Sequence, residues 1–192
     1  MKMRPRTHLH VVLFMALIAQ ILTAKLEGYG QVTQGQSRDE EIAQLIAIIR
    51  NSQLRIEDPQ KVVEAINKLG EMKAASAADD LAQLLTFRLV SLGERLTGMR
   101  TEADSRFPAV SALYLIGKPA LPALVKVIEN FDEQDLMSRN ARHTIVSIFS
   151  GKLSEGVKYI NQAASECSSA LCSQRLSILA REMNRIIWES QK

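Results

Sequence analysis

Two stretches of the chain repeat one pattern: an amphipathic helix, a short turn and a second amphipathic helix. The first runs from Asp58 to Leu85 and the second from Ser105 to Asn130. A helix with an apolar stripe cannot shield that stripe from water alone, so each helix needs a partner and each pair needs a neighbour. The pattern therefore predicts a stack of helical hairpins.

Local signals mark the ends of these helices. Asp58 is a good N-cap, and Pro59 suits the first helical position, where a missing N–H costs nothing. Gly70 and Gly117 are expected to end the first helix of each pair with a positive φ. Apolar residues of the first pair follow at helical spacing: Val62, Val63, Ile66, Leu69, then Ala77, Ala78, Leu81, Leu84 and Leu85.

Further amphipathic segments flank the two pairs. A helix from Ser37 or Asp39 and a last helix over 173–190 are expected to cap the two ends of the stack. A third pair is expected over 141–164, with Gly151 in its turn. The fold class predicted is all-α, a short right-handed α-solenoid of about three helical hairpins with N- and C-terminal capping helices.

The two clearest pairs also resemble a known repeat. Leu69-Gly70-Glu71-Met72, with Leu81-Ala82-Gln83-Leu84-Leu85 after it, is similar to the HEAT-like repeat of phycobilin lyases and many unrelated bacterial proteins. Ile116-Gly117-Lys118-Pro119-Ala120-Leu121-Pro122-Ala123-Leu124 resembles the same consensus more closely. The resemblance covers roughly residues 58–164. It implies an α-solenoid and carries over no lyase residue, because such repeats serve as scaffolds, lyases and regulators alike.

The N-terminus has the composition of a secretory signal. Residues 1–24 combine a positive start, an apolar run and Leu22-Thr23-Ala24 as a cleavage site. The alternative is an uncleaved membrane anchor, although the run is shorter than a spanning helix usually is. Residues 25–37 are polar and rich in glycine, which predicts a disordered linker before a domain over 38–190. We therefore expect an exported protein, periplasmic or secreted.

The charge of the mature chain argues against one class of partner. Without Lys2, Arg4 and Arg6, the 24 basic side chains fall to 21, which match the 21 acidic ones. A neutral domain without a basic block gives no support to nucleic-acid binding.

The segment after the first pair is irregular. A helical extension to about Leu92 and then an insertion are expected, and insertions of this kind often gather on a binding face. The alternative is a solvated loop without a role. The candidate partner-contact residues on it are Glu94, Arg95, Arg100, Glu102 and Arg106.

Two cysteines stand five residues apart at a predicted helix–turn–helix corner. Cys167 and Cys172 could form a disulfide there, which export would favour, and two separate thiols are the alternative. We expect no metal site, because only His143 remains after signal removal and no ligand cluster accompanies the cysteines. Asp132, Glu133 and Asp135 lack the glycine and terminal glutamate of an EF-hand loop.

No pattern of residues indicates an enzyme. Asp79 and Asp80 are adjacent near a helix start, so they suit dipole stabilisation better than paired acid–base work. His143 has no nucleophile motif beside it, and neither a catalytic residue nor a cofactor site is predicted. The sequence favours an exported, non-enzymatic scaffold that binds a protein partner. The alternatives are a repeat-scaffold enzyme or small-ligand carrier, and the same scaffold tethered by an uncleaved N-terminal helix.

Overall fold

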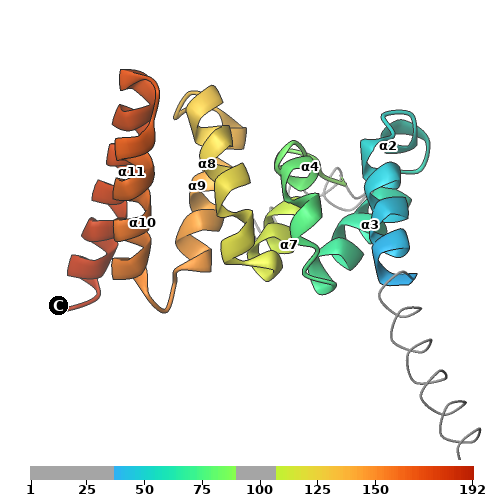
Figure 1. The fold of residues 1–192 in the computed structure, drawn as a ribbon, viewed down its shortest axis with the longest axis horizontal. Coiled ribbons are helices and arrows are strands. Elements are labelled where there is room, and N and C mark those ends of the chain that lie inside the picture. Colours follow the sequence, from blue (N-terminus) through green and yellow to red (C-terminus); the bar gives the residue numbers. More distant parts are fainter. Residues whose placement is uncertain (1–36, 90–106) are drawn as a thin grey trace, which may run out of the picture. The chain divides into compact units, whose positions relative to one another are not determined.

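The computed structural model describes residues 37–89 and 107–192 (Figure 1). All regular structure within these ranges is helical and none of it is a strand, which confirms the all-α class. The chain divides into a unit Met1–Ala43, of which residues 37–43 are described and helical, and a unit Gln44–Lys192. The predicted signal peptide and residues 25–36 of the predicted linker lie outside the described residues. The paragraphs below concern the second unit.

The first predicted hairpin forms, with different ends from those expected. It contains α3 (Pro59–Glu71), a 3₁₀ turn η1 (Ala75–Ala77) and α4 (Ala78–Ala82), preceded by the one-turn helix α2 (Leu54–Glu57). The Asp58 side chain accepts a hydrogen bond from the Lys61 amide and caps α3, with Pro59 after it, as the sequence predicts.

Two details of this hairpin correct the sequence prediction. Gly70 does not end α3: it lies inside the helix, and the positive φ of 50° falls on Lys73 instead. A Cβ on Gly70 would lie 2.7 Å from the Ala112 Cα, so its missing side chain serves a close approach between helices. The second helix does not extend toward Leu92 either, because α4 ends at Ala82 and turns follow.

The second hairpin agrees with the sequence more closely. It contains α7 (Pro108–Ile116), η2 (Lys118–Ala120) and α8 (Leu121–Asn130). Gly117 has a φ of 76°, which side chains rarely tolerate, and it ends α7 as predicted.

Three longer helices complete the unit: α9 (Leu136–Ile148), α10 (Leu153–Glu166) and α11 (Ala170–Glu189). Asp135 caps α9 by accepting from the Met137 amide at 2.8 Å, and Ser169 caps α11 by accepting from the Cys172 amide at 3.1 Å. The expected third hairpin pairs differently, because α10 packs chiefly on α11 while α9 packs on α7 and α8.

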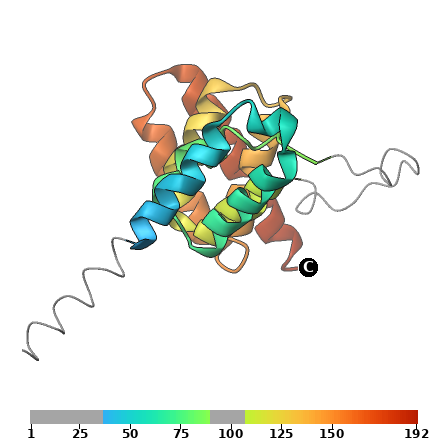
Figure 2. The ribbon, with the colours of Figure 1, turned by 90° about the vertical axis from the view of Figure 1, so that its right-hand side faces the viewer.

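The helices pack in two rows. In one row α3 contacts α7 and α7 contacts α9; in the other α4 contacts α8 and α8 contacts α11. The labelled helices succeed one another along the long axis in Figure 1, and the view turned by 90° looks along that succession (Figure 2). Side chains with almost no exposure fill the space between the rows: Ile66, Leu69, Leu81, Leu85, Leu113, Leu124, Ile128, Ile145, Leu176 and Leu179.

Polar side chains also join distant parts of the unit. The buried Asn140 side-chain amide on α9 donates to the Leu85 carbonyl at 2.6 Å, which links α9 to the end of the first hairpin. At the surface, Lys118 on η2 donates to Glu155 on α10 at 3.1 Å, and Lys152 lies 3.3 Å from the same carboxylate. The hydrogen bonds from Lys118 and then Lys152 lower the pKa of Glu155.

No single helix in the described ranges is long and apolar enough to cross a membrane. One bent pair, Pro108–Ile116 with Lys118–Asn130, passes that test by length and composition, with an angle of 116° between its parts.

Candidate functional site

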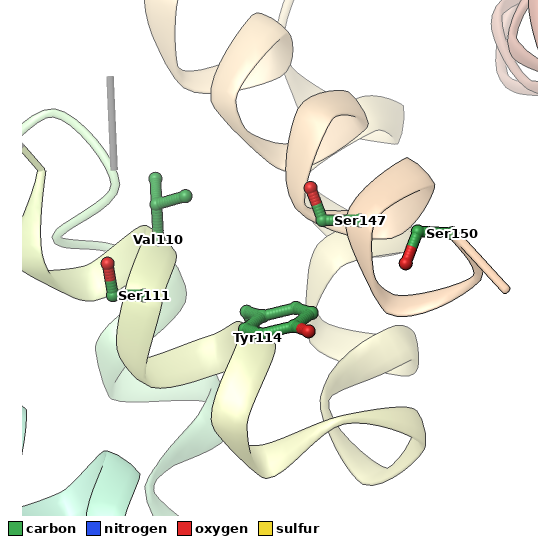
Figure 3. Close-up of a pocket in the computed structure, with 5 residues that line it drawn as sticks. All are labelled: Val110, Ser111, Tyr114, Ser147 and Ser150. Atoms are coloured by element: carbon green, nitrogen blue, oxygen red, sulfur yellow. The ribbon is translucent and has the colours of Figure 1, made fainter. Parts of the chain in front are cut away.

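A shallow hollow opens between α7 and α9. Its volume is about 290 Å³, and the described residues that line it are Val110, Ser111, Tyr114, Ser147 and Ser150 (Figure 3). The core-facing side of α7 carries Ala109, Ala112, Leu113 and Ile116, so the residues one turn apart at 111 and 114 face outward.

The described residues that line this hollow are uncharged and rich in hydroxyl groups. Tyr114 is 49% exposed and presents a ring together with a hydroxyl. Ser147 lies in the last turn of α9, and Ser150 lies in the turn that follows the helix. None of the described lining residues is a histidine, lysine, aspartate or glutamate. The arrangement suits a neutral surface that accepts hydrogen bonds and apolar contact.

The next residue of α7 after Tyr114 is also exposed. Leu115 follows Tyr114 and is 44% exposed, although it lies on a helix whose other apolar residues are mostly buried. We call Tyr114, Leu115, Ser147 and Ser150 the α7–α9 face. A second hollow of about 240 Å³ lies between α4 and α8 and is lined mainly by polar and small side chains, among them Asp79, Gln83, Lys126 and Asn130.

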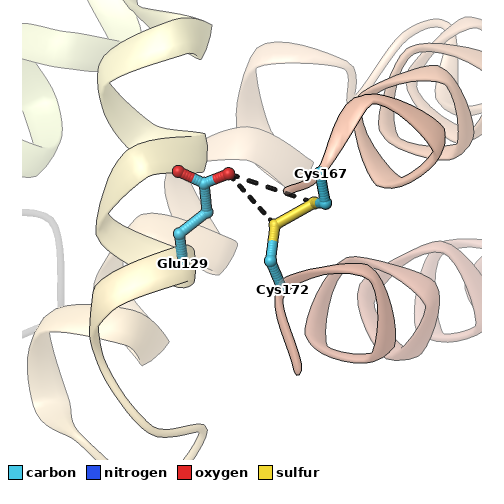
Figure 4. Close-up of side chains that lie close together, drawn as sticks. All are labelled: Glu129, Cys167 and Cys172. Atoms are coloured by element: carbon cyan, nitrogen blue, oxygen red, sulfur yellow. Dashed lines mark hydrogen bonds between the residues drawn. A yellow bond between two sulfur atoms is a disulfide. The ribbon is translucent and has the colours of Figure 1, made fainter. Parts of the chain in front are cut away.

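A different cluster forms at the corner between α10 and α11. A disulfide joins Cys167 and Cys172, whose Cα atoms lie 5.8 Å apart, so the structure adopts the bridged one of the two arrangements that the sequence leaves open. The carboxylate of Glu129, at the end of α8, reaches over this bridge (Figure 4). Its Oε1 lies 3.0 Å from the Cys172 Sγ and 3.9 Å from the Cys167 Sγ.

These two contacts are drawn as dashed lines in Figure 4, but in the disulfide neither sulfur carries a proton. A carboxylate oxygen and a disulfide sulfur both offer lone pairs, so the contacts are not hydrogen bonds in this state. A proton on the Glu129 carboxylate, or a cation between its oxygen and the two sulfurs, would turn these contacts into favourable interactions.

Arg175 holds the Glu129 backbone against α11. Arg175 is 8% exposed, and its guanidinium donates to the Glu129 carbonyl at 2.7 Å and to the Ile128 carbonyl at 3.4 Å. It also pairs with the Asp132 carboxylate. The last carbonyls of a helix lack partners within that helix and carry its negative end, so a buried cation is stabilising there.

The acidic residues singled out in the sequence are used separately. Asp135 caps α9, Asp132 pairs with Arg175, and Glu133 lies 3.9 Å from Arg142. Each of the three carboxylates thus interacts with a different partner, rather than all three with one calcium ion.

The remaining residues that the sequence draws attention to are dispersed. Asp80 accepts from Arg50 at 2.6 and 3.0 Å, which raises the pKa of Arg50, while its neighbour Asp79 is exposed. His143 is exposed on α9. The candidate contact residues Glu94, Arg95, Arg100, Glu102 and Arg106 lie outside the described residues.

The sequence reasoning missed two members of the corner cluster. Glu129 stands 38 and 43 positions before the two cysteines, so no local spacing connects them. Arg175 carries a readable signal, because it is a charged residue among the apolar positions of the last helix, between Cys172 and Leu179.

Comparisons with protein-family models, with curated proteins and with solved structures found no match for this chain. The resemblance to HEAT-like repeats therefore stays a prediction from the residues.

Proposed function

We propose that the chain is an exported, non-enzymatic scaffold that binds a protein partner. Its helical pairs form a short solenoid of HEAT-like repeats, and the α7–α9 face is the part of the described surface that meets the partner. The helix contacts support this reading, since α3, α7 and α9 follow in one row and α4, α8 and α11 in the other.

The observation that carries the proposal is the exposure of Tyr114, which lines the hollow together with serine hydroxyls. The next residue on α7, Leu115, is nearly half exposed as well. Tyrosine is enriched at protein interfaces because it supplies contact area and a hydrogen bond together. The backbone N–H and C=O groups of a protein partner would form hydrogen bonds with these uncharged hydroxyls.

The same hollow gives less support to a small-ligand carrier or an enzyme. Ligand pockets usually enclose about 300–1,000 Å³ and place a few polar or charged groups around a buried apolar cavity. The hollow has about 290 Å³, at the lower edge of that range, and the one ionisable group in its described lining is the Tyr114 phenol, with no histidine, carboxylate or lysine.

The proposed compartment is the periplasm or the cell exterior. The disulfide between Cys167 and Cys172 supports export, because structural disulfides persist where thiols are not kept reduced. N-terminal sequencing of the protein recovered from the envelope or medium tests this. A new N-terminus near Lys25 indicates cleavage, and an intact Met1 indicates the tethered alternative.

Site-specific photo-crosslinking tests the binding face. The change Tyr114→p-benzoylphenylalanine places a light-activated group at the α7–α9 face, and the full chain is then irradiated in the cells that produce it. We expect a discrete higher-mass protein adduct that mass spectrometry identifies.

The matched control is the same substitution at Lys158, an exposed residue of α10 away from the lining of the hollow. Adduct formation at Tyr114 but not at Lys158, and its loss when Ser150→Trp fills the hollow, supports the proposal. Equal adducts at both positions, or none at either, would overturn it.

A further inference from the structure

We propose that Glu129, Cys167 and Cys172 form a redox-gated site for a divalent cation of the zinc type. The disulfide closes the site. Reduction opens it and supplies two thiolates, to which Glu129 adds a carboxylate oxygen. This inference does not depend on the proposed scaffold function, and in an oxidising compartment the site stays closed until a dithiol reductant reaches the disulfide.

The positions of the ligand atoms carry the first step. One oxygen of Glu129 and the two sulfurs lie within 4.8 Å of one another. Zinc binds thiolate sulfur at about 2.3 Å and carboxylate oxygen at about 2.0–2.2 Å in tetrahedral geometry, which sets an oxygen–sulfur separation of roughly 3.6 Å. The observed separations of 3.0 and 3.9 Å lie on either side of that value. To separate the two sulfurs, only the cysteine side chains have to rotate, because the Cα atoms of Cys167 and Cys172 already lie 5.8 Å apart.

The second step is that the ligands are held in place independently of the disulfide. Arg175 lies one turn after Cys172 on α11 and donates to the Glu129 carbonyl, so α8 and α11 stay joined when the sulfurs separate. Ser169 caps α11 and places Cys172 in the first turn, where the helix dipole favours a thiolate. A site held by such fixed supports loses less entropy when it takes up an ion.

The site is open to solvent on one side. Cys172 is 3% exposed, whereas Cys167 is partly exposed and Glu129 is exposed, so an ion reaches the cluster from the side of Glu129 and Cys167. Three protein ligands leave a fourth tetrahedral position for water. Two sulfurs with one oxygen suit zinc better than calcium or magnesium, which take oxygen ligands, or copper(I), which prefers soft ligands.

The redox step balances with a dithiol or a phosphine as the reductant. The reductant gives two electrons, the sulfur–sulfur bond breaks, and each sulfur takes one proton. Cation binding then replaces those two protons, which leave to solvent. Because only the reduced chain binds the ion, the ion stabilises the reduced form and oxidation expels the ion.

Cobalt(II) is the spectroscopic probe for this site, and zinc(II) is the competitor. The full chain is titrated with cobalt(II) in the presence of a phosphine reductant and, in parallel, without it. For the reduced chain we expect one cobalt per chain, thiolate-to-metal charge-transfer absorption and complete displacement by zinc. The oxidised chain should show none of these signals.

Paired carboxylate variants test the role of Glu129. Glu129→Gln should weaken binding by at least about tenfold, as loss of a ligand or its support does at other metal sites. Glu166→Gln is the control, because Glu166 is an exposed carboxylate directly before Cys167 and should not be a ligand. Glu129→His exchanges an oxygen ligand for a nitrogen ligand and should keep one cobalt per chain with a shifted spectrum.

The outcomes separate clearly. Loss of binding in Glu129→Gln with retention in Glu166→Gln and Glu129→His supports the site, and circular dichroism verifies that each variant is folded. Absence of thiolate absorption in the reduced wild-type chain overturns the proposal. Equal affinity of Glu129→Gln and the wild type overturns it as well.

Discussion

Adding a single methyl group at Gly70 tests the packing of the first two hairpins. In Gly70→Ala the new Cβ would lie 2.7 Å from the Cα of Ala112 and 3.0 Å from its Cβ. The nearest atom belongs to the backbone of α7, so a side-chain rotation cannot relieve the clash. Either α3 or α7 has to shift.

Two effects of opposite sign decide the magnitude. Replacing glycine by alanine inside a helix gains about 1 kcal/mol of helix propensity. Overpacking a tight contact costs about 1–3 kcal/mol, and a backbone contact belongs in the upper part of that range. We therefore expect the free energy of unfolding of Gly70→Ala to fall by about 1–2 kcal/mol. At roughly 2–4 °C per kcal/mol for a domain of this size, the Tm falls by about 2–8 °C.

Gly151→Ala is the matched control for this experiment. A Cβ there meets no atom within 4 Å, so the change should raise the stability by about 0.4–1 kcal/mol by restricting the unfolded chain. Urea unfolding and thermal melts followed by far-ultraviolet circular dichroism measure both variants. If Gly70→Ala is as stabilising as Gly151→Ala, α3 and α7 do not approach as closely as described and the stacking argument fails.

Two further predictions concern buried polar groups. Arg175→Met should lower the free energy of unfolding by about 2 kcal/mol, because it leaves the Ile128 and Glu129 carbonyls without their charged donor. Urea unfolding measures this loss. A change below about 0.5 kcal/mol would show that water replaces the guanidinium. Burial and then the charge of Glu166 raise the pKa of Tyr159 in the folded chain. The neutral Tyr159 side chain therefore stabilises the fold fully below the unfolded-state pKa of about 10. This stabilisation is lost as the pH rises through the higher pKa of the folded state. In urea unfolding, the stability of wild type relative to Tyr159→Phe should therefore be constant up to about pH 9 and fall from about pH 10 upward, and parallel pH profiles would contradict this.

Local capping signals were the most reliable guide to the fold. Asp58 with Pro59 begins α3, and Gly117 ends α7, because a cap and a positive φ depend on a few adjacent residues. The prediction that Gly70 ends α3 was wrong, because glycine also occurs where two helices approach each other closely. That contact involves Ala112, a residue 42 positions later, and no sequence pattern near Gly70 announces it.

The pairing of the later helices could not be read from periodicity. The apolar stripes of α9 and α10 identify which faces are buried but not which helix covers each face. The short connection between them suggests a hairpin, whereas α10 has α11 as its main partner and α9 fits against α7 and α8. The disulfide sits in the turn between α10 and α11, so the covalent bond and the packing select the same pair.

The corner cluster shows why a site can stay hidden in a sequence that reveals its fold. Two of its ligand atoms come from Cys167 and Cys172, whose spacing is visible, and the third comes from Glu129 at the end of another helix. Helix ends are where polar side chains from different elements meet, because the last carbonyls need donors and attract a residue such as Arg175. Once α8 ends against α11 for that reason, the Glu129 carboxylate is carried to the sulfurs. The placement of the candidate site thus follows from the capping of one helix by another, which is a tertiary contact that a single sequence does not display.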